Sequence, residues 1–154
     1  MNVFINCPFD STYQEFFMAI VFTVKKLGFI PRCALEEINS AEQRIQKIKR
    51  IITECQYGIH DISYTELDEV NQLPRFNMPL ELGLFLGIHD NSSNISALIL
   101  DKERYRYQKF ISDIAGQDIK SHSGDIKILI KAIRDWLISL PNTQKKSFGD
   151  KKNL

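Results

Sequence analysis

The chain has 154 residues, of which 44% are hydrophobic and 25% are charged, a composition typical of one globular domain with a substantial core. Its formal net charge of +1 gives no electrostatic case for binding nucleic acid or a membrane surface. No stretch has the length needed to span a bilayer, and the N-terminus lacks the features of a signal peptide. Three widely spaced cysteines argue against a disulfide framework or a zinc site, so we expect a reduced, cytoplasmic protein.

The first half of the chain alternates short apolar runs with amphipathic segments. We expect a strand at 3–5, a helix that follows the capping residues 10–12 and ends at Gly28, and a strand at 29–35 in which Pro31 marks a sheet edge. Asn39 and Ser40 then cap a second helix. Its exposed face is basic, with Arg44, Lys47, Lys49 and Arg50. Such a face is usually only solvated, although Arg44 could reach a phosphate.

The second half continues this alternation. We expect strands at 57–62 and 95–100, separated by a polar loop over 64–77 and by a helix that begins near Pro79. Residues 111–119 can hold a short fifth strand, and 126–137 predicts a last helix that ends before Pro141. The domain therefore spans residues 1–142, and residues 143–154 form a flexible basic tail. Alternating strands and helices predict a mainly parallel sheet with helices on both faces.

A single acidic residue, Glu81, interrupts the apolar helix that follows the motif LPRFNMP at 73–79. Proline is favoured at the first helical position, where its missing N–H would be unsatisfied anyway, so we place Pro79 there and Glu81 in the first turn. The helix N-terminus stabilises a carboxylate in that turn, which faces the edge of the sheet where open α/β folds bind ligands. Glu81 is either a plain first-turn acid or the catalytic carboxylate of a nucleotide-cleaving site.

The carboxyl ends of the other predicted strands bring further polar groups to the same edge of the sheet. They are Asn6, Cys7, Pro8 and Phe9 after the first strand, Arg32 to Glu36 near the second, Asp61 and Ser63 at the third, and Asp101 at the fourth. Asp61 and Ser63 either make local hydrogen bonds or contact a ligand, and Cys7 fits a buried thiol better than a nucleophile. The sequence contains no dinucleotide-binding glycine motif, no P-loop and no metal-ligand spacing.

Three of these segments resemble the nucleoside 2-deoxyribosyltransferase superfamily: the strand followed by residues 7–9, the strand ending at 60–63, and the helix start at 79–83. The stretch 40–63 also resembles the middle of Toll/interleukin-1 receptor (TIR) domains, in which a helix of regularly spaced isoleucines and a strand ending in serine precede the helix with a catalytic glutamate. Both families have a flavodoxin-like topology, and both can break the bond between a ribose and a base. The resemblance implies a three-layer sandwich with five strands in the order 2-1-3-4-5, and it implies Glu81 as the catalytic residue.

Two features depart from the deoxyribosyltransferase pattern. The first strand has no tyrosine of the kind that hydrogen-bonds the nucleophile. Arg75 lies six positions before Glu81, where that family places an aspartate that reads the base. Because a guanidinium binds phosphate in a bidentate manner, Arg75 suits a phosphorylated substrate, and Asn77 can add a neutral hydrogen bond.

We therefore expect an enzyme that cleaves the N-glycosidic bond of a nucleotide, with NAD as the leading substrate and with no separate cofactor. Glu81 would stabilise or trap the ribosyl cation, Asp61 and Ser63 would hold ribose hydroxyls, and Arg32 or Arg75 would hold phosphate. A role in bacterial antiviral defence, with a partner defence protein, is implied by the resemblance only. The alternatives are a nucleoside 2-deoxyribosyltransferase and a non-catalytic, nucleotide-sensing TIR-like interaction module.

Two segments carry large side chains that are hard to bury within one domain. They are 64–78, with Phe76 and Met78, and 104–110, with Tyr105, Tyr107 and Phe110. Aromatic residues, methionine and arginine are enriched at interface cores. We expect a homo-oligomer that uses one of these segments.

Overall fold

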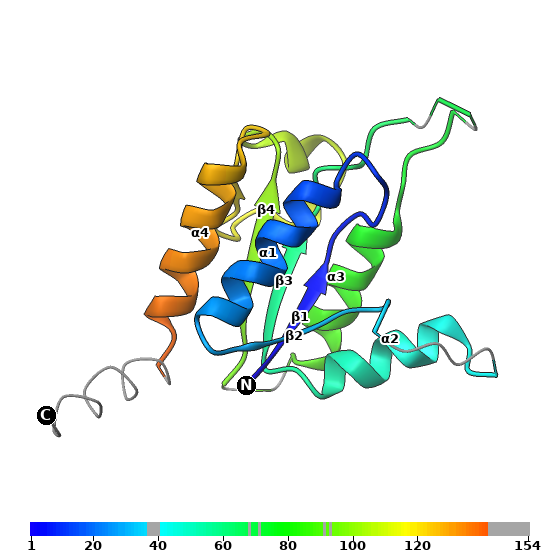
Figure 1. Ribbon diagram of the computed structural model, residues 1–154. Coiled ribbons are helices and arrows are strands. Elements are labelled where there is room, and N and C mark those ends of the chain that lie inside the picture. Colours follow the sequence, from blue (N-terminus) through cyan, green and yellow to red (C-terminus); the bar gives the residue numbers. More distant parts are fainter. Residues whose placement is uncertain (37–40, 68, 71, 91, 93, 142–154) are drawn as a thin grey trace, which may run out of the picture.

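The computed structural model describes residues 1–36, 41–67, 69–70, 72–90, 92 and 94–141. Among these residues, five parallel strands form one sheet in the order β2-β1-β3-β4-β5, which confirms the predicted α/β fold and its flavodoxin-like strand order. Helices cover both faces of the sheet, giving a three-layer sandwich (Figure 1). None of the helices formed by these residues has both the length and the apolar character needed to cross a bilayer.

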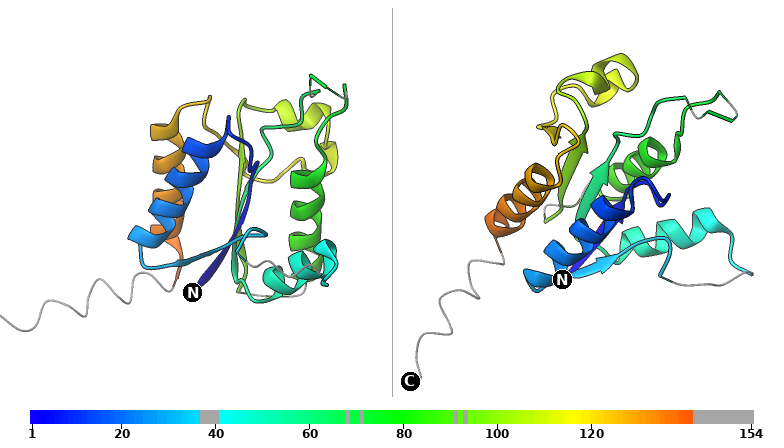
Figure 2. Two further views of the ribbon diagram at one scale, coloured as in Figure 1. Left: turned by 45° about the vertical axis from the view of Figure 1, so that its right-hand side comes forward. Right: turned by 45° about the horizontal axis from the view of Figure 1, so that its top comes forward.

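The elements alternate along the chain. The strands are β1 (Asn2–Asn6), β2 (Ile30–Arg32), β3 (Tyr57–Asp61), β4 (Ser96–Asp101) and β5 (Lys120–Ser121). The α-helices are α1 (Gln14–Lys26), α2 (Arg44–Thr53), α3 (Asn77–Ile88) and α4 (Ile126–Ser139), and two 3-10 helices, η1 (Arg106–Lys109) and η2 (Ser112–Ile114), lie between β4 and β5. Helices α1 and α4 lie on one face of the sheet, and α2 and α3 lie on the other (Figure 2).

Alternating side chains on the central strands divide the core into two layers. Val3 and Ile5 of β1 belong to the layer shared with α1 and α4, whereas Phe4 belongs to the layer shared with α2 and α3. On the first side, α4 contributes Leu129, Ile133 and Leu137, which recur at helical spacing. The central strands are buried on both faces, as is usual for a parallel sheet covered by helices.

Three predicted boundaries are wrong. The fifth strand lies at 120–121 and not within 111–119, where η2 forms and the isoleucines pack against a core cluster on the α3 side of the sheet. Strand β2 covers only Ile30–Arg32, although it does lie at the sheet edge as Pro31 indicates. Helix α3 begins at Asn77, so Pro79 is its third residue. Proline is tolerated there because the first four N–H groups of a helix have no partner within it.

Two other predictions concern residues that the structure does not describe. The proposed cap at Asn39 and Ser40, and the end of the domain at 142 with its tail over 143–154, lie outside them. Within them, α2 begins at Arg44, and its basic face is not uniformly solvated, since Lys47 is buried.

The side chains predicted to form a subunit interface differ in their exposure to solvent. Phe76, Tyr105 and Phe110 are exposed, whereas Met78 and Tyr107 are buried in the core. The buried pair is therefore not available for contacts between subunits, and this part of the prediction is wrong for those two residues.

Candidate functional site

Three carboxylates lie at the carboxyl-terminal edge of the sheet, each in a different setting. Asp61 ends β3 and Asp101 ends β4, while Glu81 lies in α3, which contacts β1 and β3. Strands β2 and β3 lie on opposite sides of β1, so this edge includes the topological switch point of the sheet. Open α/β folds bind their ligands at such points.

Asp61 is fully buried, and both of its oxygens accept hydrogen bonds. Oδ1 accepts from the Ser63 N–H at 2.9 Å and from the Ser63 hydroxyl, and Oδ2 accepts from the Tyr13 hydroxyl. His122, which directly follows β5, places Nε2 3.1 Å from Asp61 Oδ2 and 2.9 Å from Ser63 Oγ. Donors thus surround this carboxylate, as a buried charge requires.

Ser63, His122 and Asp61 do not form a catalytic triad. In a triad the histidine meets the serine with one ring nitrogen and the aspartate with the other. Here Nε2 faces both, while Nδ1 accepts a hydrogen bond from the Gly124 N–H at 3.1 Å. Nε2 therefore carries the ring proton and has no lone pair with which to take a proton from Ser63. We interpret this cluster as a structural network that joins β3, the end of β5 and, through Tyr13, the start of α1.

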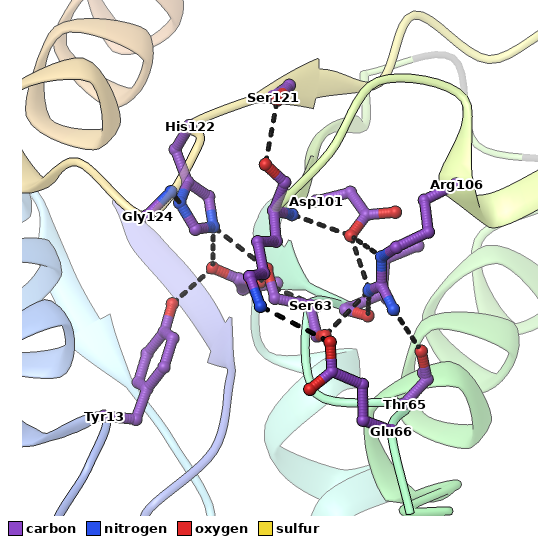
Figure 3. A network of polar contacts seen from close by, with 12 residues as sticks. Tyr13, Ser63, Thr65, Glu66, Asp101, Arg106, Ser121, His122 and Gly124 are labelled. Atoms are coloured by element: carbon purple, nitrogen blue, oxygen red, sulfur yellow. Dashed lines mark hydrogen bonds and ion pairs between the residues drawn. The ribbon is translucent and has the colours of Figure 1, made fainter.

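Asp101 has the second setting, a buried ion pair. Its Oδ1 accepts from Arg106 Nε at 3.0 Å and from Arg106 Nη2 at 2.6 Å. Arg106 also donates to Thr65 Oγ1 and to the carbonyl oxygens of Ile62 and Ser63, so it ties β4 to the segment after β3 (Figure 3). Burial raises the pKa of Asp101, although Arg106 opposes the shift. Oδ2 of Asp101 has no hydrogen-bond partner among the described residues.

Glu81 has the third setting, because it is buried without a partner. It is 6% exposed and makes no hydrogen bond or ion pair with any described residue. It is the fifth residue of α3 and so lies beyond the first turn, contrary to the prediction, where the helix N-terminus stabilises a charge less. Burial raises the pKa of Glu81 to about 7, and the Arg44 guanidinium opposes the shift. Near neutral pH this carboxyl group is therefore able to act as an acid or as a base.

Two buried polar side chains hold the start of α3 in place. Asn6 Nδ2 donates to the Met78 carbonyl oxygen at 2.8 Å and to His60 Nδ1 at 3.1 Å. Burial lowers the pKa of His60 to about 3, so the ring is neutral and its proton lies on Nε2. Gly58 makes room for this ring, because a Cβ there would lie 2.5 Å from His60 Nε2 and 2.9 Å from the Phe85 ring. Strands β1 and β3 thus fix the turn that precedes the site carboxylate.

The residues predicted after β1 lie inside the protein. Cys7 and Pro8 are buried, and Phe9 packs edge-on against Phe17 of α1. Burial, together with nearby Asp61, raises the pKa of the Cys7 thiol well above its usual range. The thiolate is the reactive form of cysteine, so Cys7 is unsuited to be a nucleophile.

Of the basic residues near α2, Arg32 is engaged and Arg44 is free. Arg32 forms ion pairs with Glu36 at 2.6 Å and with Glu54 at 2.9 Å. Arg44 is exposed and makes no hydrogen bond or ion pair with a described residue, yet it is close enough to affect the pKa of Glu81. Arg44 is therefore the better placed of the two to meet a phosphate beside Glu81.

Arg75 joins two segments that flank the site. It is 46% exposed and pairs with Asp10 in the loop between β1 and α1. Desolvation raises the pKa of Asp10, but hydrogen bonds from Thr12 and Arg75 outweigh it, and the net pKa is lowered. Asn77, the first residue of α3, is exposed. The two predicted contacts on this side are thus near the surface, in contrast to Asp61 and Ser63.

The partners of the two aspartates at the polar edge are not visible in the sequence. Tyr13 and His122 lie far along the chain from Asp61, and only the fold brings them to it. Arg106 lies only five residues after Asp101, but the sequence does not show that the two side chains pair. The misplaced fifth strand also hides His122, which directly follows β5. The one available signal is an aspartate at the end of a buried strand, since a buried carboxylate requires donors.

Two cavities lie elsewhere on the protein. One, of about 890 Å³, lies between β4, β5 and α4, and another, of about 520 Å³, lies on the outer face of α3. Neither cavity is lined by Asp61, Glu81 or Asp101. Within the described ranges, no group of three or more histidine, cysteine, aspartate or glutamate side chains could hold a metal ion.

No protein-family model matches the chain, and a search of curated proteins finds no match.

Proposed function

We propose that this protein is an enzyme that cleaves the N-glycosidic bond of a nucleotide, with NAD as the leading substrate. The observation that carries the proposal is Glu81, a buried carboxyl group without a partner among the described residues, beside the switch point of a flavodoxin-like sheet. Burying such a group without a partner costs stability, so chemistry explains its presence better than folding does. The resemblance to TIR domains and deoxyribosyltransferases supports the same residue.

Glu81 would act at C1′ of the ribose. The bond between C1′ and the base nitrogen breaks with its electron pair going to the base, so the cationic nicotinamide of NAD leaves as neutral nicotinamide. A carboxylate facing the remaining oxocarbenium-like cation stabilises it or traps it as an ester, the logic that glycosidases use. Water then bonds to C1′ and loses a proton, which completes hydrolysis. The cationic nicotinamide of the bound substrate would itself favour the ionised form of Glu81.

The roles of the other predicted site residues depend on whether their side chains are exposed and free to contact a substrate. Arg44 would hold phosphate in preference to Arg32, which is neutralised by two carboxylates. Arg75 could do so only after it releases Asp10. Asp61 and Ser63 would support the site from the interior and would not meet the ribose, because both are buried and hydrogen-bonded to each other.

The proposals for cofactor, compartment, biological role and oligomeric state each have a basis other than Glu81. NAD would be consumed as the substrate, and no resident cofactor is proposed. Cys7, Cys33 and Cys55 are all free thiols, which supports a reducing, cytoplasmic setting. A role in bacterial antiviral defence with a partner protein rests on the resemblance alone, and a homo-oligomer rests on the exposed apolar side chains considered below.

Release of nicotinamide from NAD by the purified protein tests the proposal. Glu81→Gln is compared with Glu15→Gln, which removes an exposed carboxylate in the first turn of α1. Electrostatic stabilisation of a transition state is worth roughly 10²–10³ in rate, so Glu81→Gln should lose that factor and Glu15→Gln should retain full turnover. Equal cleavage by the two variants would refute the assignment.

The same assay separates the alternatives. Transfer of deoxyribose from a deoxynucleoside to a second free base, without cleavage of NAD, would identify a nucleoside 2-deoxyribosyltransferase. Saturable binding of NAD by the wild type without release of nicotinamide would identify a nucleotide-sensing module.

A further inference from the structure

The loop between β3 and α3 includes an apolar segment whose described residues are 67, 69–70 and 72–74, and we call these residues the arm. An antiparallel bridge between Leu67 and Pro74 closes it into a hairpin-like loop. Leu67, Val70 and Leu73 are 60%, 89% and 62% exposed. Figures 1 and 2 show this loop extending away from the body of the protein, beyond the N-terminal end of α3. Apolar side chains gathered at an exposed position mark an interaction site.

The outer face of α3 carries a groove of about 520 Å³, which we call the α3 groove. It is lined by Leu80, Gly83, Leu84, Gly87 and Ile88, with Lys49 of α2 as its charged member. A Cβ atom at Gly83 or Gly87 would meet no atom within 4 Å, so nothing in the described chain covers this face. A helix that is apolar all round is normally buried all round, and α3 has only its inner side covered.

We propose that the arm of one copy of this chain inserts into the α3 groove of a second copy. Both surfaces are apolar, and their exposed charges are opposite, with Glu69 on the arm and Lys49 in the groove. The arm extends beyond the N-terminal end of α3 (Figure 1), whereas the groove is lined by residues along α3 from Pro79 to Ile88, so the contact forms between copies. Because each chain has one arm and one groove, a two-fold axis allows a reciprocal exchange and a closed dimer.

This inference does not depend on the proposed enzymatic function. Glu81 faces the interior, away from the outer face of α3, so Glu81→Gln should dimerise like the wild type. Failure of the nicotinamide assay and failure of the dimer are therefore separate results.

Sedimentation velocity over a concentration series tests the contact. We expect a wild-type dimer, and we expect Leu73→Asp in the arm and Gly83→Glu in the groove each to raise the dissociation constant by on the order of tenfold or more, because each buries a charge in an apolar contact. Gly83→Glu leaves the arm unchanged, so it keeps the test valid if Leu73→Asp disturbs the loop. The matched control is Phe22→Asp, an exposed apolar residue of α1 on the opposite face of the sheet, which should dimerise normally.

Charge reversal then tests the pairing of the two surfaces. Lys49→Glu and Glu69→Lys should each weaken the dimer, and the double variant should restore it. A wild type that stays monomeric at hundreds of micromolar would overturn the proposal. A dimer that ignores both Leu73→Asp and Gly83→Glu, or a double variant that restores nothing, would overturn it as well.

Discussion

Asp61 and Glu81 are both buried carboxyl groups at one edge of the sheet, but their surroundings are opposite. Asp61 accepts hydrogen bonds from Tyr13 and Ser63 and lies beside His122, whereas Glu81 has no partner among the described residues. Asp101 lies between these extremes, since Arg106 pairs with one of its oxygens. Burial alone therefore does not identify the functional acid of this edge. The satisfied carboxylates hold the loops together, and the unsatisfied one is available to a substrate.

The contrast between partnered and partnerless carboxyl groups would fail if Asp101 could lose Arg106 without a loss in the free energy of unfolding. Arg106→Met leaves Asp101 uncompensated in the interior, and removing one member of a buried ion pair costs about 3–5 kcal/mol. Urea unfolding followed by circular dichroism measures this loss. Lys102→Met, which removes an exposed ion pair with Glu66 at 3.4 Å, should cost at most about 1 kcal/mol. Equal losses in the two variants would contradict the distinction.

Glu81 should show a pH dependence of opposite sign to that of a paired carboxylate. Its folded pKa of about 7 lies above its ordinary value of 4.5, so the folded state binds more protons between these two values. The free energy of unfolding therefore falls as the pH rises through that window, by about 3 kcal/mol at about 1.36 kcal/mol per pKa unit. Glu81→Gln removes this dependence, so we expect it to gain stability relative to wild type between pH 4.5 and pH 8.

Urea unfolding of both proteins at several pH values measures that difference. Glu15→Gln is the matched control, because its carboxylate is exposed at the start of α1. If wild type and Glu81→Gln lost stability in parallel over this range, the partnerless burial of Glu81 would be disproved.

Asp61→Asn tests whether the hydrogen-bonded carboxylate Asp61 has a structural role and not a catalytic one. The amide of the variant places N–H groups against the donors of Tyr13 and His122, and leaving such buried groups unpaired costs about 1–3 kcal/mol. Thermal or urea unfolding should show this loss, while nicotinamide release by the folded protein falls far less than in Glu81→Gln. A loss of turnover as large as that of Glu81→Gln, with stability unchanged, would return Asp61 to substrate binding.

The smallest effect on stability belongs to Arg75. Its exposed pair with Asp10 is worth roughly 0–1 kcal/mol, so Arg75→Ala should unfold nearly as the wild type does. In binding we expect more, because a charged hydrogen bond to phosphate contributes about 1–3 kcal/mol. Titration calorimetry should show that the wild type prefers nicotinamide mononucleotide to its nucleoside and that Arg75→Ala loses part of this preference, while Arg44 supplies the rest.

Asp10→Asn completes that test, because it releases the guanidinium and should strengthen nucleotide binding. Equal affinity of the wild type for the nucleotide and the nucleoside would eliminate the phosphate role of Arg75.

The elements of the fold that could be predicted are those that depend on local pattern. Short apolar runs separated by amphipathic segments imply a parallel sheet with two helical layers, and the strand order follows the resemblance to flavodoxin-like families. Glu81 could be singled out because one acid within an apolar helix is visible in the chain itself. Its turn was misplaced because proline fits any position of the first turn, and a start at Asn77 satisfies that rule as well as a start at Pro79 does.

The partners of the aspartates could not be predicted, because they depend on contacts between distant segments. His122 reaches Asp61 only because β5 pairs with the end of β4, and Tyr13 reaches it from the loop before α1. The ion pair of Arg32 with Glu54 likewise depends on where the end of α2 lies relative to β2, whereas Glu36 is only four residues from Arg32 in the chain. Residue type identified the charged groups, but only the fold decides which charges are neutralised.

The pKa of Glu81 is the measurement that tests the central claim most directly. Carbon-detected NMR titration of the side-chain carboxyl groups, with Glu81→Gln to assign the resonance, follows this group in the free protein. We predict a midpoint near pH 7 and a lower midpoint when NAD is bound, since the cationic nicotinamide favours the carboxylate. A midpoint near 4.5 that NAD does not change would contradict the claim that Glu81 is the unpaired, functional acid of this site.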